Sequence, residues 1–316
     1  MPASPDAPFR VEWHDRLITD QVEAVRTLAA AASGADGVSP LSEDVLLHLE
    51  TAEPDRQHAL LTGPGGELAG YGQLTVAREG AGRPTGQAEL VVHPAFRGHR
   101  HGQALLGALR DRAGGRLRVW AHGTTVAATR VAATAGMRQV RVLWQVQRPL
   151  TLDLPQPTWP AGIEVRPFVP GVDGERWVAC NARAFASHPE QGGWTLADLE
   201  QREAEPWFDA AGFFVALRPV GAGESAGRFA GFHWTKVHSD RPGGPIGEVY
   251  VIGVDPDDQG GGLGKALLLQ GLVYLRDVRG LREVMLYVDE DNDAAMGLYE
   301  RLGFRRVHAD VMFETP

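Results

Sequence analysis

The sequence predicts an α/β protein of two tandem domains, each with a mixed, mostly antiparallel central sheet flanked by helices. Two observations support this prediction. First, ELVVHPAFRGHRHGQALLGALRD (89–111) matches VIGVDPDDQGGGLGKALLLQGLV (251–273), and a later match aligns ATAGM (133–137) with ERLGF (300–304). Second, the proline-rich segment PLTLDLPQPTWPAG (149–162) divides the chain almost in half and has no helical or strand pattern. We therefore expect domains over 1–148 and 163–316, joined by a linker over 149–162.

The second copy is expected to run strand, glycine loop, helix, strand, helix, strand. An apolar run over 248–254 has the length of a strand, and apolar residues from Leu263 onward recur at helical spacing. A buried strand over 284–288, a helix over 293–302 closed by a glycine, and a last strand over 304–313 follow. The first copy starts with the apolar run 88–92.

Upstream of the second copy, FFVALRP and RFAGFHWTKVH predict antiparallel strands separated by VGAGESAG. Strands followed by helices, with a splayed sheet edge near the glycine loop, indicate a layered α/β fold.

Composition excludes several classes of protein. The formal net charge of −9 and the pI of about 5.7 predict no nucleic-acid partner. Cys180 is the only cysteine, which excludes an internal disulfide and a cysteine-based zinc cluster, and we expect it to fill core space. His188 and His238 show no paired carboxylate in a metal-binding pattern, so no metal is expected. No stretch approaches the roughly 20 apolar residues of a membrane span, so we predict a cytoplasmic protein, and a monomer.

The glycine cluster over 260–264 lies where a helix should begin, although glycine costs a helix about 1 kcal/mol relative to alanine. Unpaired backbone N–H groups and the positive end of the helix dipole make such an end an anion site. Glycines allow a pyrophosphate to approach this backbone, and Leu263 should anchor the turn to the core. The segment is not a Walker P-loop, because Ala266 follows Lys265, and it lacks the Rossmann glycine spacing.

The segment VDPDDQGGGLGK (254–265) resembles motif A of the GCN5-related N-acetyltransferase (GNAT) family, whose glycine loop binds the coenzyme A pyrophosphate, and DNDAAMGLYERLGF (291–304) resembles motif B. Two such modules in tandem, together with HPEQGGW (188–194) and HWTKVH (233–238), resemble a branch of this family that acetylates the cysteinyl amine of a cysteinyl-glucosamine-inositol pseudodisaccharide. The resemblance implies acetyl coenzyme A (acetyl-CoA) as co-substrate, a small-molecule thiol as acceptor, and tandem GNAT-like domains.

The resemblance implies two catalytic residues and one backbone donor. Glu248 opens the strand before the glycine loop, where a carboxylate could take a proton from the ammonium group of the acceptor. Tyr299 occupies the family position of the residue that protonates the departing sulfur. A bulge in the strand before the loop should turn a backbone N–H toward the thioester carbonyl, and Val254 is the candidate donor.

The resemblance also implies which residues contact each substrate. The coenzyme contacts expected in the C-terminal domain are Ile252, Gly253, Val254, Gln259, Gly260, Gly261, Gly262, Leu263, Gly264, Lys265, Asn292, Asp293, Ala294, Ala295, Met296 and Gly297. Those in the N-terminal domain are Leu90, Val91, Val92, Arg97, Gly98, His99, Arg100, His101 and Gly102. The acceptor contacts are Glu43, Glu190, Lys236, Glu248 and Tyr287, with Trp194 and Trp234 as candidate sugar-stacking or core side chains.

The N-terminal copy lacks the catalytic pair, because Tyr299 aligns with Ala132 and Glu248 with Gly86. It should therefore be non-catalytic. Arg97 and Arg100 add positive charge at its helix start, so it could still hold coenzyme A. Two other functions stay open: a GNAT enzyme acting on a protein N-terminus or an aminoglycoside, and a non-enzymatic coenzyme A sensor, against which the intact Glu248 and Tyr299 argue.

Overall fold

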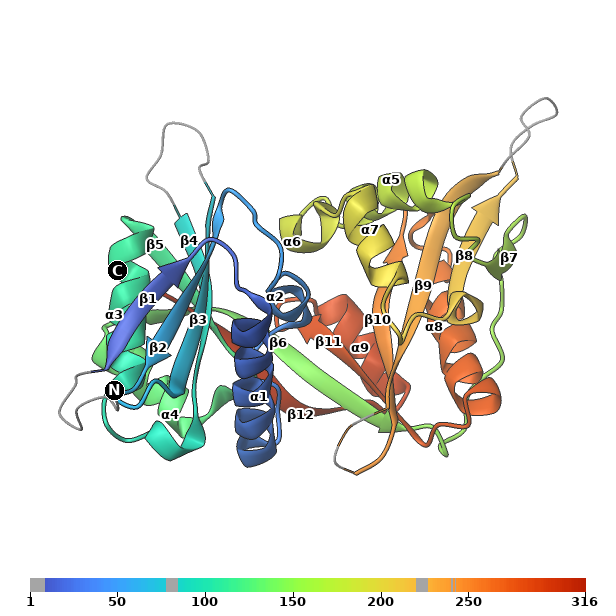
Figure 1. Cartoon of the computed structure of the whole chain (residues 1–316). Helices are drawn as coiled ribbons and strands as arrows, with labels where there is room; N and C mark the ends of the chain where they lie inside the picture. The colour runs from blue at the N-terminus through green and yellow to red at the C-terminus, as the bar shows by residue number, and fades with distance from the viewer. Residues whose placement is uncertain (1–8, 78–84, 220–226, 240, 242) are drawn as a thin grey trace. The chain divides into compact units, whose positions relative to one another are not determined.

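The computed structural model describes residues 9–77, 85–219, 227–239, 241 and 243–316, so most of the expected VGAGESAG loop lies outside the described residues. The chain forms two compact units (Figure 1). Unit 1 contains Met1–Trp144 and His308–Pro316, and unit 2 contains Gln145–Val307. The units do not follow chain order throughout, since the last strand, which begins in unit 2, joins the sheet of unit 1 from His308 onward.

Unit 1 is a β-sheet packed against helices, and its strands lie in the order β1-β2-β3-β4-β5-β12. Among the strand pairs that the described residues of this unit form in this order, only β4 and β5 run parallel. Its elements are β1 (Arg10–His14), α1 (Thr19–Asp36), α2 (Glu43–Leu47), β2 (Arg56–Thr62), β3 (Leu68–Ala77), β4 (Thr85–Val92), α3 (His101–Ala113), β5 (Arg116–Ala121), α4 (Val126–Thr134) and most of β12 (Arg305–Glu314). The strand β6 (Arg138–Pro149) begins in unit 1 and ends in unit 2.

Unit 2 has the strand order β11-β10-β9-β8-β7, again mostly antiparallel, with β10 and β11 parallel. Its elements are β7 (Glu164–Pro167), α5 (Gly174–Ala184), α6 (Pro189–Gly192), α7 (Leu196–Glu203), β8 (Phe213–Arg218), β9 (Arg228–His238), β10 (Ile246–Val254), α8 (Leu263–Val273), β11 (Glu283–Asp289) and α9 (Asp293–Arg301). The predicted mixed, mostly antiparallel α/β fold is confirmed, and the expected 149–162 linker is free of helix and strand after Pro149.

The two copies of the repeat share the same order of elements. In each copy a strand (β4 or β10) leads through a 3₁₀ turn into a helix (α3 or α8), a parallel strand (β5 or β11), a short helix (α4 or α9) and a final strand (β6 or β12). The short helices begin alike, because the Thr125 and Asn292 side chains accept hydrogen bonds from Ala128 N–H and Ala295 N–H. This correspondence places the same two loops in each copy.

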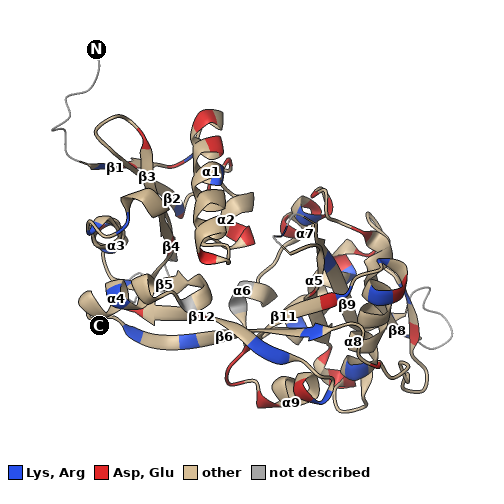
Figure 2. Ribbon diagram, turned by 90° about the horizontal axis from the view of Figure 1, so that it is seen from below, with Lys and Arg blue, Asp and Glu red and all other residues tan. Residues whose placement is uncertain are grey.

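Each unit has its own apolar core. In unit 2 aromatic rings fill the space beneath α5, and Trp177 and Trp234 are fully buried among them. Cys180 belongs to the same cluster, so the expectation that it fills core space is confirmed, and burial raises the pKa of its thiol to about 12. No helix in the described part of the chain has the length and apolar content that crossing a membrane requires. Basic and acidic residues both occur in each of the two units (Figure 2).

Candidate active site

The glycine loop of unit 2 is an open backbone turn at the start of α8. Gly260 and Gly262 have φ angles of 82° and 84°, in the left-handed region that favours glycine, and Gly262 is the N-cap of the helix. A Cβ built at any of residues 260–262 would meet nothing within 4 Å. The glycines therefore serve backbone conformation and outward access. Leu263 is 1% exposed, which confirms the expected anchor.

Two buried carboxylates hold the turn that precedes this loop. Asp255 accepts hydrogen bonds from the Arg183 guanidinium at 2.8 and 3.0 Å, and these bonds lower the pKa of its carboxyl. Asp258 pairs with Arg218 at 2.7 Å and also with Arg228. Because a charge-assisted pair of this kind fixes geometry, the loop is held in place before any ligand arrives.

The strand β10 separates from its neighbours just before the loop. It pairs with β11 only at Gly247 and Glu248, and its register with β9 shifts between Val249 and Val251, which is a β-bulge. The predicted splayed edge and bulge are both present. Because Asp255 N–H donates to Ala230 O at 2.9 Å, the alternation of an antiparallel ladder turns Val254 N–H away from β9. The Val254 N–H points to the side of β10 on which pairing with β11 has ended.

Glu248 lies at this separation point, 7% exposed, with a histidine beside it. Its Oε2 is 2.6 Å from Nε2 of His238, whose side chain is 27% exposed. Sequence spacing gave no sign of this pair, because the two residues come from adjacent antiparallel strands rather than from one helix face. His188 likewise lies 3.5 Å from a carboxylate oxygen of Asp289.

Tyr299 is on α9, 8% exposed, with its ring edge-on to Phe304. Burial raises the pKa of its phenol to about 12, so the hydroxyl stays protonated across the physiological range. The cap residue Asn292 accepts the Ala295 N–H at 3.1 Å and thereby fixes the start of this helix. A buried, neutral phenol is suited to donating a hydrogen bond or a proton.

The expected acceptor residues are distributed over both units. In unit 2 the Lys236 ammonium lies over the Trp207 ring, 4.1 Å from its centroid, and Tyr287 on β11 is 39% exposed. Glu190 belongs to α6, but its side chain lies outside what the structure describes. Glu43 opens α2 in unit 1.

Of the two candidate sugar-stacking tryptophans, Trp234 is fully buried and stacks on Phe213, so it is a core residue. Trp194 is partly buried beneath the Arg202 guanidinium, which lies 3.8 Å from the centre of its ring.

Unit 1 reproduces the glycine loop with different side chains. Gly98 has a φ angle of 84°, and Arg100 adopts a φ of 64° as the N-cap of α3, the one non-glycine residue with positive φ in the described chain. Arg97 Nε donates to Val92 O at 3.1 Å, as the Gln259 amide does to Val254 O at 3.3 Å. The Arg97 guanidinium is also bidentate to Asp36 at 2.7 and 2.8 Å, so its charge is partly neutralised.

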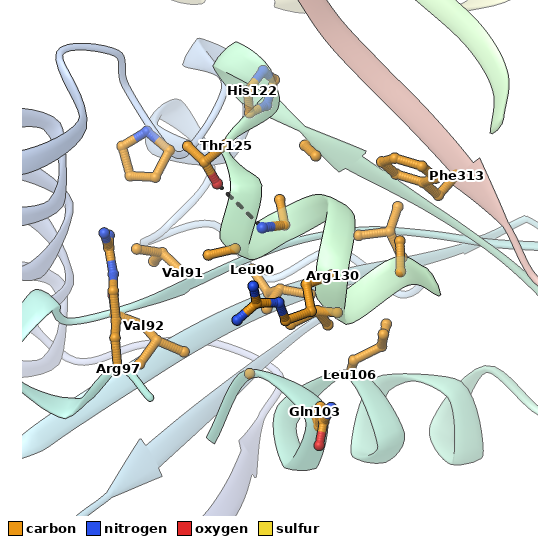
Figure 3. Close-up of a pocket in the computed structure, with 18 of the residues that line it drawn as sticks. Leu90, Val91, Val92, Arg97, Gln103, Leu106, His122, Thr125, Arg130 and Phe313 are labelled. Carbon is orange, nitrogen blue, oxygen red and sulfur yellow. Dashed lines mark hydrogen bonds between the residues drawn. The ribbon is translucent and has the colours of Figure 1, made fainter. Parts of the chain in front are cut away.

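A cavity of about 360 Å³ opens beside this loop between β4, β5, α3 and α4, and most of the N-terminal residues that were expected to contact coenzyme A line it. Figure 3 shows Leu90, Val91 and Val92 along β4, with His122 at the end away from Gln103 and Leu106 of α3. Of the N-terminal coenzyme set, only His99 does not line it. A volume of this size lies in the range of small-molecule sites.

The bulge on β10 changes which residue of unit 1 matches Glu248, the candidate base. Glu248 pairs across the parallel ladder with Met285, and the matching residue of β5, Arg118, pairs with Gln87 rather than with Gly86. The β3–β4 ladder of unit 1 shows no register shift, whereas β10 has one extra residue at its bulge. Gly86 instead matches Gly247. Unit 1 therefore carries a neutral amide at the position of Glu248 and, as predicted, Ala132 at the position of Tyr299.

The described residues contain no group of three or more histidine, cysteine or carboxylate side chains placed to hold a metal ion. The coenzyme residues expected in unit 2 lie on three segments: Ile252, Gly253 and Val254 end β10, residues 259–265 form the loop and the start of α8, and residues 292–297 lie at the start of α9.

Comparisons with known proteins agree with this geometry. The family model "Acetyltransferase (GNAT) family" matches residues 23–137 and 181–304. A "Mycothiol acetyltransferase" of Thermobispora bispora is 55% identical over 92% of this chain and 95% of that protein, and one of Streptosporangium roseum is 50% identical over 96% and 98%.

Solved structures show the same architecture. A GCN5-related N-acetyltransferase from Sphaerobacter thermophilus has a TM-score of 0.64 at 26% identity, with 97% of this chain and 96% of that chain covered. A tandem GNAT protein from the clavulanic acid biosynthesis pathway has a TM-score of 0.68 at 19% identity, over 96% and 98%, and shows the fold alone. The chain belongs to the GNAT acetyltransferase family, with mycothiol acetyltransferases as its full-length relatives.

Proposed function

We propose that the chain transfers the acetyl group of acetyl-CoA to the cysteinyl amine of 1D-myo-inositol 2-(L-cysteinylamino)-2-deoxy-glucopyranoside, the last step of mycothiol biosynthesis. The observation that carries this proposal is the combination, in unit 2, of a bulged strand, an open glycine loop, a buried glutamate and a buried tyrosine. The name of the 50–55% identical relatives, mycothiol acetyltransferase, supports this acceptor.

The glycine loop fits the diphosphate of the co-substrate. Backbone N–H groups at the start of α8 are accessible because no side chain rises from residues 260–262, and the helix dipole favours an anion there. Acetyl-CoA supplies an activated thioester. The remaining requirements are a neutral amine, stabilisation of the developing oxyanion, and a proton for the leaving thiolate.

Three groups of unit 2 meet these requirements in the proposed mechanism. Glu248 accepts the ammonium proton, directly or through water, and the adjacent His238, which is partly exposed, gives that proton a route to solvent. Val254 N–H donates to the carbonyl oxygen as negative charge develops there. Tyr299 donates its phenolic proton to the sulfur, which its protonated state allows. Lys236 and Tyr287 are proposed as acceptor contacts, together with Glu190 and Glu43.

Unit 1 is proposed to bind a second coenzyme molecule without catalysing a reaction. The loop retains the backbone of the unit 2 loop even though Arg100 must adopt a left-handed conformation, and a cavity adjoins it. Gln87 and Ala132 supply neither base nor acid. Titration calorimetry with coenzyme A should give two sites per chain, and Arg100→Glu should remove one while most turnover remains.

The function is tested by acetyl-CoA turnover with three kinds of acceptor. Release of free thiol should be rapid with the cysteinyl pseudodisaccharide and slow with free-amine peptides or aminoglycosides. Turnover only with peptides or aminoglycosides would reassign the acceptor while retaining the acetyltransferase chemistry. Binding of coenzyme A with no turnover on any amine would indicate a sensor instead. That the protein is cytoplasmic and monomeric remains a prediction.

A further inference from the structure

The bulge on β10 is produced by one residue, Tyr250. Val249 pairs with Thr235 of β9. The next residue along β9, Trp234, pairs with Val251, so Tyr250 is the extra residue of the bulge. Successive side chains of a regular strand point to opposite faces of the sheet. Tyr250 and Val251 instead pack into the same hydrophobic cluster, so the bulge directs the tyrosine ring toward the aromatic core of unit 2.

The side chain of Tyr250 is held by aromatic rings and by an arginine. Its ring centroid lies 5.0 Å from that of Trp207 and 5.2 Å from that of Trp234, edge-on in both cases. Its hydroxyl oxygen accepts a hydrogen bond from Nε of Arg202 at 3.0 Å. A hydrogen bond from a charged donor is stronger than one between neutral groups, so this contact ties the bulge to α7.

Arg202 is itself fixed on α7. It is 3% exposed, its Nη1 donates to Asp198 O at 3.0 Å, and its guanidinium lies 3.8 Å from the centre of the Trp194 ring. The helix starts with a capping box, in which the side chains of Thr195 and Asp198 each accept the backbone N–H of the other residue. A buried guanidinium with these contacts has little freedom to move, so Tyr250 bonds to a fixed donor.

Unit 1 shows what the corresponding strands do without a bulge. There the parallel pair β4–β5 continues through Glu89 and Trp120. In unit 2 the pair β10–β11 ends at Glu248 and Met285. Because Gln87 is the counterpart of Glu248, the strands of unit 1 stay paired for two residues beyond the point at which those of unit 2 separate. A bulge bends its strand and increases the local twist, which accounts for the separation of β10 from β11 here.

We propose that Tyr250 and Arg202 are positioning residues for acetyl transfer: they hold the bulge of β10, and thereby the gap toward β11 that Val254 N–H faces. This inference rests on the proposed function, in which that N–H donates to the thioester carbonyl and Glu248 accepts the proton of the amine. The bulge lies between these two groups along the strand, so it sets their spacing. Loosening Tyr250 shifts the donor relative to the base without removing either group.

Steady-state kinetics on the full chain test this inference. Tyr250→Phe keeps the ring and removes the hydroxyl, and Arg202→Met removes the guanidinium and keeps an extended side chain. Each should lower kcat about tenfold, the size of one charged hydrogen bond, with the KM values for acetyl-CoA and for the amine within about threefold. The double variant should lose no more than the larger single loss, because both changes remove the same contact. The losses should persist as the pH rises, unlike the loss in Glu248→Gln.

Tyr274→Phe is the matched control. Tyr274 is a buried tyrosine of unit 2 that lies outside β10, and its hydroxyl bonds to the carboxylate of Asp209. Its removal should leave kcat unchanged. An unchanged kcat in Tyr250→Phe would overturn the inference, and so would an equal loss in the control or losses that add in the double variant. Deletion of Tyr250, which gives β10 the unbulged register of β4, should lower kcat further, and if that variant does not fold, Tyr250→Phe decides the result.

Hydrogen exchange separates failure of this inference from failure of the proposed function. Amides of residues 249–254 should exchange faster in Tyr250→Phe than in the wild type, and at the wild-type rate in Tyr274→Phe. If the wild-type chain acetylates no amine, the proposed function fails, and faster exchange over 249–254 still supports the holding of the bulge by Tyr250. Unchanged exchange over these residues refutes it, with or without turnover.

Discussion

The imidazolium of His122 should make the stability of unit 1 fall as the pH rises. Burial disfavours the charged form, but the carboxylates of Glu89 and Asp310 beside the ring raise its folded pKa to about 10, and the reference value of a free histidine is 6.5. A group whose pKa is raised on folding stabilises the protein fully below its unfolded pKa and loses that contribution as the pH passes through the folded value. The window is therefore pH 6.5 to 10, and stability decreases through it.

The magnitude follows from the size of the shift. Each unit of pKa difference corresponds to about 1.4 kcal/mol, so the full contribution is about 5 kcal/mol, and the part lost between pH 7 and 9.5 is about 3 kcal/mol. His122→Asn keeps a polar side chain that does not titrate. Relative to the wild type, this variant should be several kcal/mol less stable at pH 7 and nearly as stable at pH 9.5.

Urea unfolding at several pH values measures this difference, with tryptophan fluorescence as the signal. Trp120 stacks near the imidazole, with ring centroids 6.3 Å apart, and contributes to this signal. An NMR titration of His122 provides a second readout, in which the ring should remain protonated up to about pH 9. Parallel stability profiles for the wild type and His122→Asn, or a His122 that titrates near pH 6.5, would refute this explanation.

Three further predictions concern unit 2. Gly262→Arg, which copies Arg100 of unit 1, should lower the free energy of unfolding by about 1–2 kcal/mol because of the positive φ, and should raise the KM for acetyl-CoA. An unchanged KM would argue against the loop as the diphosphate site. Gly271→Ala should destabilise the protein by about 1–3 kcal/mol in thermal unfolding, because the added Cβ would lie 2.1 Å from the buried His233 ring. An unchanged stability would contradict that packing. The acetylation rate of Glu248→Gln should fall about 10²–10⁴-fold near neutral pH and recover as the amine deprotonates near pH 8, whereas the rate of Tyr299→Phe should stay low at every pH. If the pH–rate profiles of both variants run parallel to that of the wild type, neither residue transfers a proton.

The order of elements could be predicted from the sequence because it depends on local signals. Apolar periodicity located β10, α8 and β11, and the glycines at 260–264 could be assigned to a turn since positive φ is a property of the residue type itself. The Leu263 anchor is local as well. Each of these predictions needs only neighbours within a few positions.

The features that sequence reasoning missed depend on contacts between distant segments. His238 meets Glu248 across a hairpin, and Glu89 meets Ser42 over 47 residues, for which no spacing rule exists. The bulge on β10 was expected from the family resemblance, but its effect on the alignment was not, because one extra residue shifts every match upstream of it by one. That shift turned the counterpart of Glu248 from Gly86 into Gln87.

The two units carry the same loop backbone with different side chains around it. Both keep the loop backbone, since Gly98 and Gly260 have φ angles of 84° and 82° and the following N-caps are left-handed in each. Around that common loop the side chains differ in opposite directions. Unit 2 carries the buried Glu248 and Tyr299, whereas Ala132 leaves the tyrosine position of unit 1 as part of a cavity wall. A cavity that adjoins the loop backbone but has neither of these groups is suited, in the proposed function, to bind coenzyme A without reacting.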